Sequence, residues 1–285
     1  MSEFAPGLYV VATPIGNMGD VTLRAIETLS RADVVYAEDP RSAKKLFDRH
    51  AIAPKQLWRY DDHSDARERE RILERLEARS EIICLISDAG TPLIADPGFK
   101  LVREARRRHL PVHPVPGASA LTAGLSVSGL PTDKFMFVGF LPSKKEARRK
   151  ALAEYAPLDA TLVFYESPRR LAESLADAAD LLGDRQACLM RELTKIHEEA
   201  LALTLAELRD AVASREKIYG ECMVAVAAPK KGAATTNEEA AEETLRGLLA
   251  RMRVKDAVAL AQSRTGMAPK TLYAMALAIK GREDA

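Results

Sequence analysis

The segment SDAGTPLIADPG at residues 87–98 concentrates the residue types that suit a ligand-binding loop. It holds two aspartates, two prolines and two glycines within twelve residues, directly after the apolar run EIICLIS at 81–87. Glycine lets the backbone approach a ligand closely, and the loop offers amides, carbonyls and carboxylates for recognition. A plain connection between a strand and a helix needs fewer special residues. We therefore expect residues 87–98 to line a binding site.

A second segment, AEDPR at 37–41, places two carboxylates and a cation after another apolar run. Asp39 followed by proline fits the cap of a helix. Equally, Glu38 and Asp39 are suited to orienting a hydroxyl, and Arg41 to holding a phosphate. Both interpretations stay open, because a capping residue can also face a cleft.

Two later segments repeat this arrangement. FYESPRRL at 164–171 fits a helix that starts at Ser167 and Pro168. The neighbouring Tyr165, Glu166 and Arg169 are then left as side chains for a cleft. RELTKIHEE at 191–199 is a polar edge with acidic, basic and hydroxyl side chains after a further apolar run.

Several familiar chemistries lack their sequence signatures. No Gly-Lys-Ser/Thr follows a glycine-rich loop and no G-x-G-x-x-G opens the first helix, which disfavours nucleoside triphosphate and nicotinamide chemistry. No G-x-S-x-G elbow supports covalent hydrolysis. The five histidines do not pair with one another or with cysteine at zinc-site spacing. DDHSD at 61–65 offers oxygen ligands for a hard cation, but helix capping is the commoner role. We expect no metal site.

Short apolar strands followed by helices must position these loops. Over 1–117 this alternation repeats, which indicates a parallel sheet covered on both faces, with ligands at the carboxyl ends of its strands. A second α/β domain is expected over 118–228, then a linker at 229–240 and a basic helical tail at 241–285. In the second domain we expect strands at 135–140, 161–165, 186–190 and 221–228, and helices at 144–155, 168–182 and 204–214.

The formal net charge of +1 hides an uneven distribution of charge. The 285 residues include 42 Lys and Arg against 41 Asp and Glu, but residues 246–282 hold eight basic side chains and one acidic one. Further basic clusters lie at 103–108 and 144–150. A solvated helix face explains each cluster alone, whereas the three together favour a polyanion such as RNA. Aromatic residues, at 5%, are too few for a stacking platform of the kind that binds single strands.

The helical tail supports two structural interpretations. Its two helical segments flank Thr265 and Gly266, which fits a helix-turn-helix-like fold or a plain stabilising hairpin. The three cysteines lie far apart in apolar runs, as expected for reduced thiols in a cytoplasmic protein. We expect neither a secretory leader nor a membrane span.

Together, these segments resemble the branch of the tetrapyrrole methylase-like superfamily that methylates small-subunit ribosomal RNA. The resemblance covers residues 7–228 and is carried in order by ATPIGNMGDVTLRA, AEDPR, SDAGTPLIADPG, VPGASA, GLPTDKFMFVGFLP, FYESPRRL and RELTK. It implies two α/β domains of tetrapyrrole methylase type with the cofactor cleft between them, plus a C-terminal helical extension. It also implies a homodimer that transfers the methyl group of S-adenosylmethionine to the ribose 2′-hydroxyl of a cytidine in the decoding region of 16S rRNA.

The resemblance further assigns roles to single residues. Those implied to bind S-adenosylmethionine are Pro14, Asp88, Ala89, Gly90, Thr91, Ser119, Ala120, Tyr165, Leu193 and Ala225. A carboxylate base would help to remove the hydroxyl proton, and the unranked candidates are Glu38, Asp39 and Glu192. Arg41, Arg169 and Lys195 are expected to hold phosphates of the RNA.

The chain departs from the family pattern in two places. Pro40 stands where the family usually has a threonine, and only His63 of DDHSD matches a pair of histidines often found there. Two alternatives stay open: a methylase of a small tetrapyrrole that uses the same cleft, and a non-catalytic RNA-binding assembly factor.

Overall fold

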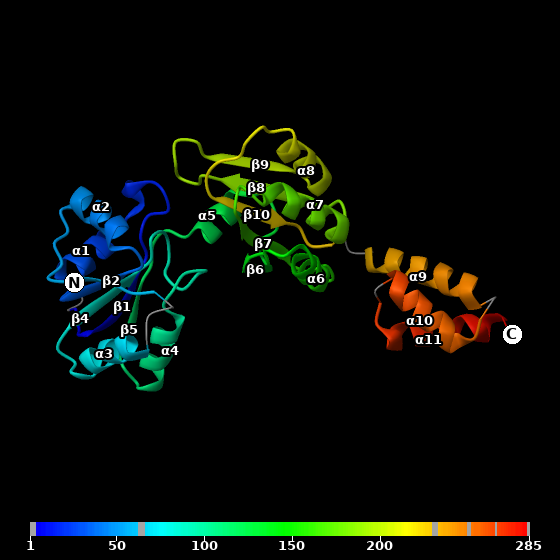
Figure 1. Cartoon of the computed structure of the whole chain (residues 1–285), viewed down its shortest axis with the longest axis horizontal. Helices are drawn as coiled ribbons and strands as arrows, with labels where there is room; N and C mark the ends of the chain where they lie inside the picture. The colour runs from blue at the N-terminus through cyan, green and yellow to red at the C-terminus, as the bar shows by residue number, and fades with distance from the viewer. Residues whose placement is uncertain (1–3, 62–65, 230–232, 250–251, 266, 284–285) are drawn as a thin grey trace. The chain divides into compact units, whose positions relative to one another are not determined.

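The computed structural model describes residues 4–61, 66–229, 233–249, 252–265 and 267–283. Most of DDHSD, including His63, lies outside these ranges. The chain forms two compact units, Met1–Ala228 and Pro229–Ala285 (Figure 1). None of the helices in the described ranges is long and apolar enough to span a bilayer.

The first sheet has five strands in the order β3-β2-β4-β1-β5, and every neighbouring pair is parallel. Its strands are β1 (Gly7–Val11), β2 (Val34–Ala37), β3 (Leu57–Arg59), β4 (Ile82–Ile86) and β5 (Val112–Val115). All four residues of β2 are buried, as expected for a strand covered on both faces. The predicted parallel sheet is therefore confirmed.

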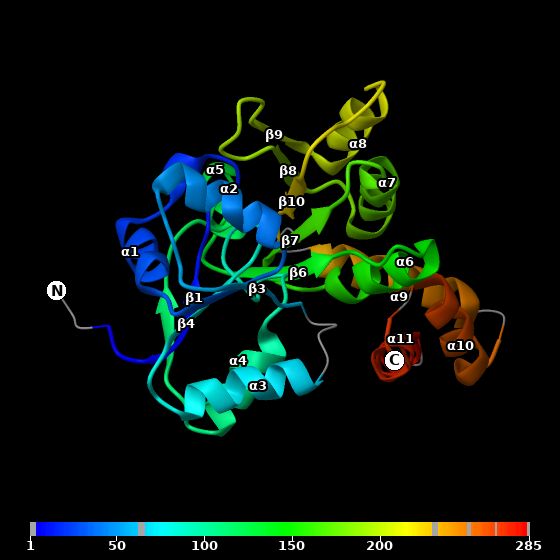
Figure 2. The ribbon, with the colours of Figure 1, turned by 60° about the vertical axis from the view of Figure 1, so that its left-hand side comes forward.

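Helices cover the two faces of this sheet in pairs (Figure 2). The helices are α1 (Leu23–Arg31), α2 (Pro40–His50), α3 (Ala66–Glu77) and α4 (Phe99–Arg107). Leu29 of α1 and Phe47 of α2 share one apolar core, and Leu73 of α3 and Leu101 of α4 share the other. This packing leaves the carboxyl ends of the strands and the loops that follow them free to build a site.

The second sheet is mixed, in the order β6-β7-β10-β8-β9. Its strands are β6 (Phe135–Phe140), β7 (Thr161–Glu166), β8 (Gln186–Arg191), β9 (Glu199–Thr204) and β10 (Cys222–Val226). Strand β10 runs antiparallel to both β7 and β8. One face packs on α6 (Lys145–Tyr155), α7 (Leu171–Leu182) and α8 (Leu205–Ala213), and the other on α5 (Ala120–Val127).

The expected start of α7 at Ser167 and Pro168 is wrong. The helix begins at Leu171, and Arg170 stands at the N-cap without a side-chain capping bond. The cause is the buried Glu166 carboxylate, which accepts hydrogen bonds from the Ser167 N–H (2.7 Å) and the Ser174 hydroxyl (2.6 Å). Arg170 pairs with the same carboxylate at 2.6 Å. These contacts hold 167–170 in a turn that brings the segment to the cavity described below.

The C-terminal unit consists of α9 (Ala233–Leu249), α10 (Val254–Thr265) and α11 (Pro269–Glu283). A small apolar core joins them, with Leu245 of α9, Ala261 of α10 and Leu272 of α11 all fully buried. Helix α9 starts inside the segment 229–240 that composition marks as a linker. Its alanines and glutamates favour a helix, which outweighs the intervening threonines and asparagine.

Candidate functional site

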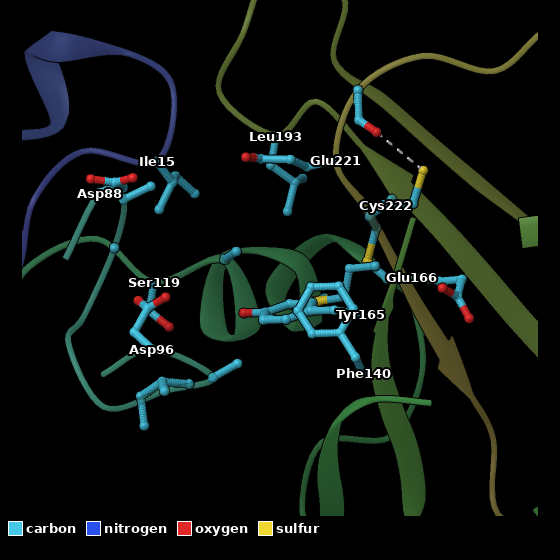
Figure 3. Close-up of a pocket in the computed structure, with 18 of the residues that line it drawn as sticks. Ile15, Asp88, Asp96, Ser119, Phe140, Tyr165, Glu166, Leu193, Glu221 and Cys222 are labelled. Carbon is cyan, nitrogen blue, oxygen red and sulfur yellow. Dashed lines mark hydrogen bonds between the residues drawn. The ribbon is translucent and has the colours of Figure 1, made fainter. Parts of the chain in front are cut away.

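A cavity of about 420 Å³ lies where loops of the first sheet face loops of the second. The first sheet contributes Glu38 after β2 and residues 88–96 after β4. The second contributes Phe140 and Tyr165, and the segment 220–223 at the start of β10. Figure 3 shows Asp88 and Asp96 on one side of this space and Phe140 and Tyr165 on the other. Its volume and concave form suit a small-molecule ligand.

The loop 87–98 is fixed by backbone contacts. Thr13 and Gly90 exchange two backbone hydrogen bonds, of 2.9 and 3.0 Å, and Gly90 has a φ of +80° that favours glycine. The Thr91 hydroxyl donates to the Ala118 carbonyl at 3.0 Å. Leu93 and Ala95 also adopt positive φ angles, of 74° and 64°, an uncommon conformation for residues with a side chain. These contacts hold the loop in one defined conformation, which agrees with its composition.

The cavity is strongly acidic. Five carboxylates line it, from Glu38, Asp88, Asp96, Glu166 and Glu221, and its described lining includes no lysine or arginine. We call it the acidic cavity. Two of the five have basic partners outside the lining, since Glu166 pairs with Arg170 and Glu221 with Lys195 at 3.2 Å. The other three carry the excess negative charge.

This charge alters the acidity of two of these groups. Burial raises the pKa of Asp96 to about 6, and the carboxylates of Glu38 and Asp88 add to the effect. Burial and Asp88 also raise the pKa of Glu38. A carboxylate with a raised pKa is a better base than an ordinary exposed one, so both groups are suited to accepting a proton.

The residues that line the acidic cavity suit S-adenosylmethionine in their charge and polarity. The sulfonium of this cofactor is a cation, and the carboxylates of Asp88, Asp96 and Glu38 offset such a charge where water is partly excluded. Apolar side chains from Ile15, Leu193 and neighbouring residues line the same space and suit the uncharged parts of the molecule. The pairing of acidic and apolar walls is what such an amphipathic cation requires.

The structure gathers most of the residues implied to bind the cofactor. Those that line the acidic cavity are Asp88, Ala89, Gly90, Thr91, Ser119, Ala120, Tyr165 and Leu193. Pro14 instead lines an adjoining cavity of about 40 Å³ that it shares with Asp88. Ala225 is fully buried in the apolar layer beneath, so it supports the wall from behind.

The three candidate bases occupy different environments. Glu38 lines the acidic cavity, whereas Asp39 and Glu192 do not. Asp39 caps α2 and pairs with Arg41 at 2.8 Å, and the hydrogen bonds from Arg41 lower its pKa to about 2. Glu192 accepts a hydrogen bond from Lys195 at 2.9 Å, which lowers its pKa. Carboxylates held by cations in this way are weak bases.

The three predicted phosphate ligands lie outside the lining of the acidic cavity. The Arg41 side chain is 89% exposed and Arg169 is also exposed, next to the lining residue Pro168. Lys195 is half-buried and already bonds two carboxylates, those of Glu192 and Glu221. Arg41 is exposed but paired with the Asp39 carboxylate, and Lys195 is engaged within its own loop, whereas Arg169 is exposed with no ion pair among the described residues.

That loop, RELTK at 191–195, belongs to the second α/β domain and contacts the first. The Thr194 hydroxyl accepts a hydrogen bond from the Asn17 N–H at 3.1 Å, across 177 residues of sequence. Gly16 lies so close that a Cβ atom there would overlap the side chain of Lys195. Glu192 and Thr194 adopt positive φ angles of 53° and 64°, which bend the loop towards the first domain.

Sequence reasoning missed two residues that shape the acidic cavity. Asp96 lies in the predicted loop 87–98 but is not among the predicted bases, although a second acid after a buried strand is a usable signal. Phe140 stands at the rim with 57% of its surface exposed. No sequence signal distinguishes it from the other aromatics of FMFVGF.

The cysteines are free and buried, as expected: Cys84, Cys188 and Cys222. Among the described residues, no group of three or more His, Cys, Asp or Glu is placed to hold a metal ion.

Comparisons with known proteins agree with this architecture. Residues 7–209 match the family model for Tetrapyrrole (Corrin/Porphyrin) Methylases, and residues 235–280 match the RsmI C-terminal HTH domain. Ribosomal RNA small subunit methyltransferase I of Pseudomonas aeruginosa is 46% identical over 280 residues, which cover 96% of this chain and 98% of that protein. The protein of that name from Erythrobacter litoralis is 48% identical, covering 97% and 96% of the two chains.

Solved structures show the same fold at lower identity. A diphthine synthase aligns with a TM-score of 0.58 at 18% identity, covering 77% of this chain and 89% of that one. The methyltransferase CobJ aligns with a TM-score of 0.57 at 19% identity, covering 78% and 94%. The chain therefore belongs to the tetrapyrrole (corrin/porphyrin) methylase family, among the members whose curated relatives are called ribosomal RNA small subunit methyltransferase I.

Proposed function

We propose that this enzyme transfers the methyl group of S-adenosylmethionine to the ribose 2′-hydroxyl of a cytidine in the decoding region of small-subunit rRNA. The observation that carries the proposal is the acidic cavity, whose charge suits a sulfonium cation. Relatives that match almost the whole chain at 46–48% identity support the RNA substrate, because their name states it.

The cofactor supplies an electrophilic methyl group, and the residues of the chain position and deprotonate the hydroxyl that receives it. The loop 87–98 and the RELTK loop form facing walls that hold the reacting groups in line and exclude water. Holding two reactants in a productive geometry accounts for much of the acceleration in reactions of this kind. Asp88 lines the acidic cavity, where its carboxylate is suited to stabilising positive charge.

We assign the proton-accepting role to Asp96, with Glu38 as its neighbour. The pKa of Asp96 is about 6, so the group is ionised at neutral pH and still basic enough to take the hydroxyl proton. Glu38 is more constrained, because its carboxylate accepts the N–H of Asp88 and has Arg59 nearby. The neighbouring Ser87 hydroxyl lowers the pKa of Asp96 and so offsets part of the effect of burial.

The exposed arginines Arg41 and Arg169 are proposed to hold phosphates on either side of the target nucleotide. Such contacts fix the register of the RNA and carry little sequence information. The C-terminal helical unit is proposed to add affinity through its basic residues, so that it strengthens RNA binding more than cofactor binding.

We further propose a cytoplasmic homodimer. Ribosomal substrate implies the cytoplasm, and the edge strand β6 exposes Phe135 and Met136, which are 45% and 39% accessible. The exposed apolar start of this edge strand needs cover, and a second copy of the chain provides it there. Sedimentation analysis of the wild type and of Phe135→Ser tests this: the wild type should be a dimer, and an unchanged dimer in the variant would remove β6 from the interface.

The substrate class is tested by following a labelled methyl group. Purified enzyme is incubated with S-adenosylmethionine labelled in the methyl group, together with small subunits that lack the modification and, separately, a small tetrapyrrole. Label should appear in the rRNA and not in the tetrapyrrole. Label only in the tetrapyrrole, or in neither acceptor, would contradict the proposal.

A further inference from the structure

An irregularity in β6 determines where Phe140 points. Phe137 lies opposite Val163 of β7, and Phe140 lies opposite Tyr165, so three steps along β6 match two along β7. The extra residue is a β-bulge. Gly139, within it, has a φ of +67° and nothing within 4 Å of an added Cβ. The backbone conformation, not crowding, is therefore the reason that glycine suits this position.

The bulge moves Phe140 to the opposite face of the sheet. Side chains alternate along a regular strand, so Phe140 would share a face with Val138, which packs against the core under α6, α7 and α8. The extra residue instead places it on the face of Phe137 and Tyr165, towards the acidic cavity. β-bulges commonly re-aim side chains beside active sites.

Phe140 and its neighbours form an aromatic wall. The ring centroids of Phe140 and Tyr165 are 5.7 Å apart at 61°, and those of Phe137 and Tyr165 are 4.9 Å apart at 67°. Both contacts are edge-to-face, so Tyr165 braces Phe140 through its edge. Tyr165 is half-buried, whereas Phe140 is 57% exposed. Figure 3 shows the two side chains next to each other.

An exposed, braced aromatic ring at the mouth of a cavity suits a flat partner. Enzymes that modify a nucleotide hold the extruded base by stacking it on aromatic side chains. The charged end of the cavity, with Asp88 and Asp96, is suited to the cation and the proton transfer and not to a neutral ring. Among the described residues that line the cavity, Phe140 is therefore the one with an exposed aromatic ring, and its side chain carries no ionised group.

We propose that Phe140 stacks on the nucleobase of the target nucleotide and so holds its ribose against the carboxylate side of the cavity. This inference rests on the proposed RNA substrate and adds a subsite for the base. Phe140 acts as a positioning residue, because it touches the base and not the atoms that react.

Substitutions of Phe140 separate stacking from general apolar contact. Stacking of one base on an aromatic side chain corresponds to about 5- to 150-fold in affinity, so Phe140→Ala should lower kcat/KM for small subunits by about that factor. Phe140→Trp should retain activity, and Phe140→Leu, which is apolar but not flat, should resemble alanine. The affinity for S-adenosylmethionine, measured by calorimetry, should stay within about twofold.

The matched control is Phe99→Ala. Phe99 is also 57% exposed but does not line the acidic cavity, so its loss should leave kcat/KM unchanged. A second readout uses RNA of the target region with a fluorescent cytosine analogue at the target position, whose emission the wild type should quench and Phe140→Ala should not.

Three outcomes would overturn the proposal. Equal kcat/KM for wild type and Phe140→Ala would remove the stacking role alone. A parallel loss of S-adenosylmethionine affinity would assign Phe140 to the adenine of the cofactor instead. A wild-type protein that binds S-adenosylmethionine but methylates no RNA would remove the proposed function and the stacking with it.

Discussion

Replacing Asp96 with asparagine tests whether this carboxylate accepts the proton of the ribose hydroxyl. The substitution preserves the shape of the side chain and removes the base. A positioned general base contributes about 10²- to 10⁴-fold to a rate, so kcat/KM for small subunits should fall by about that factor. Asp96→Glu keeps a base but displaces it, so it should retain part of the activity. In the wild type, kcat/KM should rise with pH through about 6, the pKa of Asp96.

The same substitution should stabilise the folded protein at neutral pH. Asp96 has a pKa of about 6 in the folded state, against an ordinary value of 3.8. The folded chain therefore holds this proton more tightly than the unfolded chain, and stability falls as the pH rises from about 4 to about 6. At 1.36 kcal/mol for each pKa unit, the loss is at most about 3 kcal/mol. Asp96 is partly exposed, and solvent screening reduces the expected loss to about 1–2 kcal/mol.

Urea unfolding at pH 4.5 and pH 8 measures this difference. Asp96→Asn should exceed the wild type in free energy of unfolding at pH 8, and this difference should fall to about a third at pH 4.5, which lies only just above the ordinary pKa of 3.8. Asp48→Asn, on the exposed side of α2, is the control and should change neither stability nor activity. If Asp96→Asn keeps its kcat/KM, or gains the same stability at both pH values, the assignment of Asp96 is refuted.

Further predictions concern buried charge, backbone conformation and the C-terminal unit. Arg170→Met leaves the fully buried Glu166 carboxylate without its cation and should cost about 3–5 kcal/mol in urea unfolding, whereas Lys134→Met, from an exposed pair, should cost under about 1 kcal/mol. Gly247→Ala in α9 meets nothing within 4 Å and should stabilise by about 0.5–1 kcal/mol. Gly220→Ala has a φ of +85° and meets the Glu192 side chain, so it should lower the Tm. Removing the C-terminal unit should weaken RNA binding at least about tenfold and leave S-adenosylmethionine binding unchanged, and equal RNA affinities in a filter-binding assay would contradict this.

The fold was largely predictable, because most strands are continuous apolar runs and most loops carry glycine, proline or aspartate. The two missed strands have physical reasons. Strand β3 has three residues, two of them exposed, which is too short for a periodic signal. Strand β9 lies at an edge and is only half-buried, so its sequence EALALT also suits a helix.

The candidate site was predictable only where a single segment builds it. The loop 87–98 carries its own signal, and the structure places it in the acidic cavity. The carboxylates Glu38, Asp39 and Glu192 look alike in sequence, because their different basicity comes from Arg41 and Lys195 as partners. Which carboxylate pairs with which cation depends on the directions of the side chains in three dimensions.

The side of the sheet on which Phe140 lies could not be predicted from the sequence, for a different reason. A strand pattern assigns faces by alternation, and one inserted residue reverses every later assignment. The glycine before Phe140 is compatible with a regular strand as well as a bulge. Only the register between β6 and β7 shows which applies.

The most direct test of the central claim is the identity of the methylated nucleoside. Small subunits lacking the modification are treated with the enzyme and S-adenosylmethionine, and the rRNA is digested to nucleosides and analysed by mass spectrometry. We predict one new 2′-O-methylcytidine per subunit, in the decoding region, with wild-type enzyme and almost none with Asp96→Asn. A methyl group on a base, on another nucleotide or on no RNA at all would contradict ribose methylation in the acidic cavity.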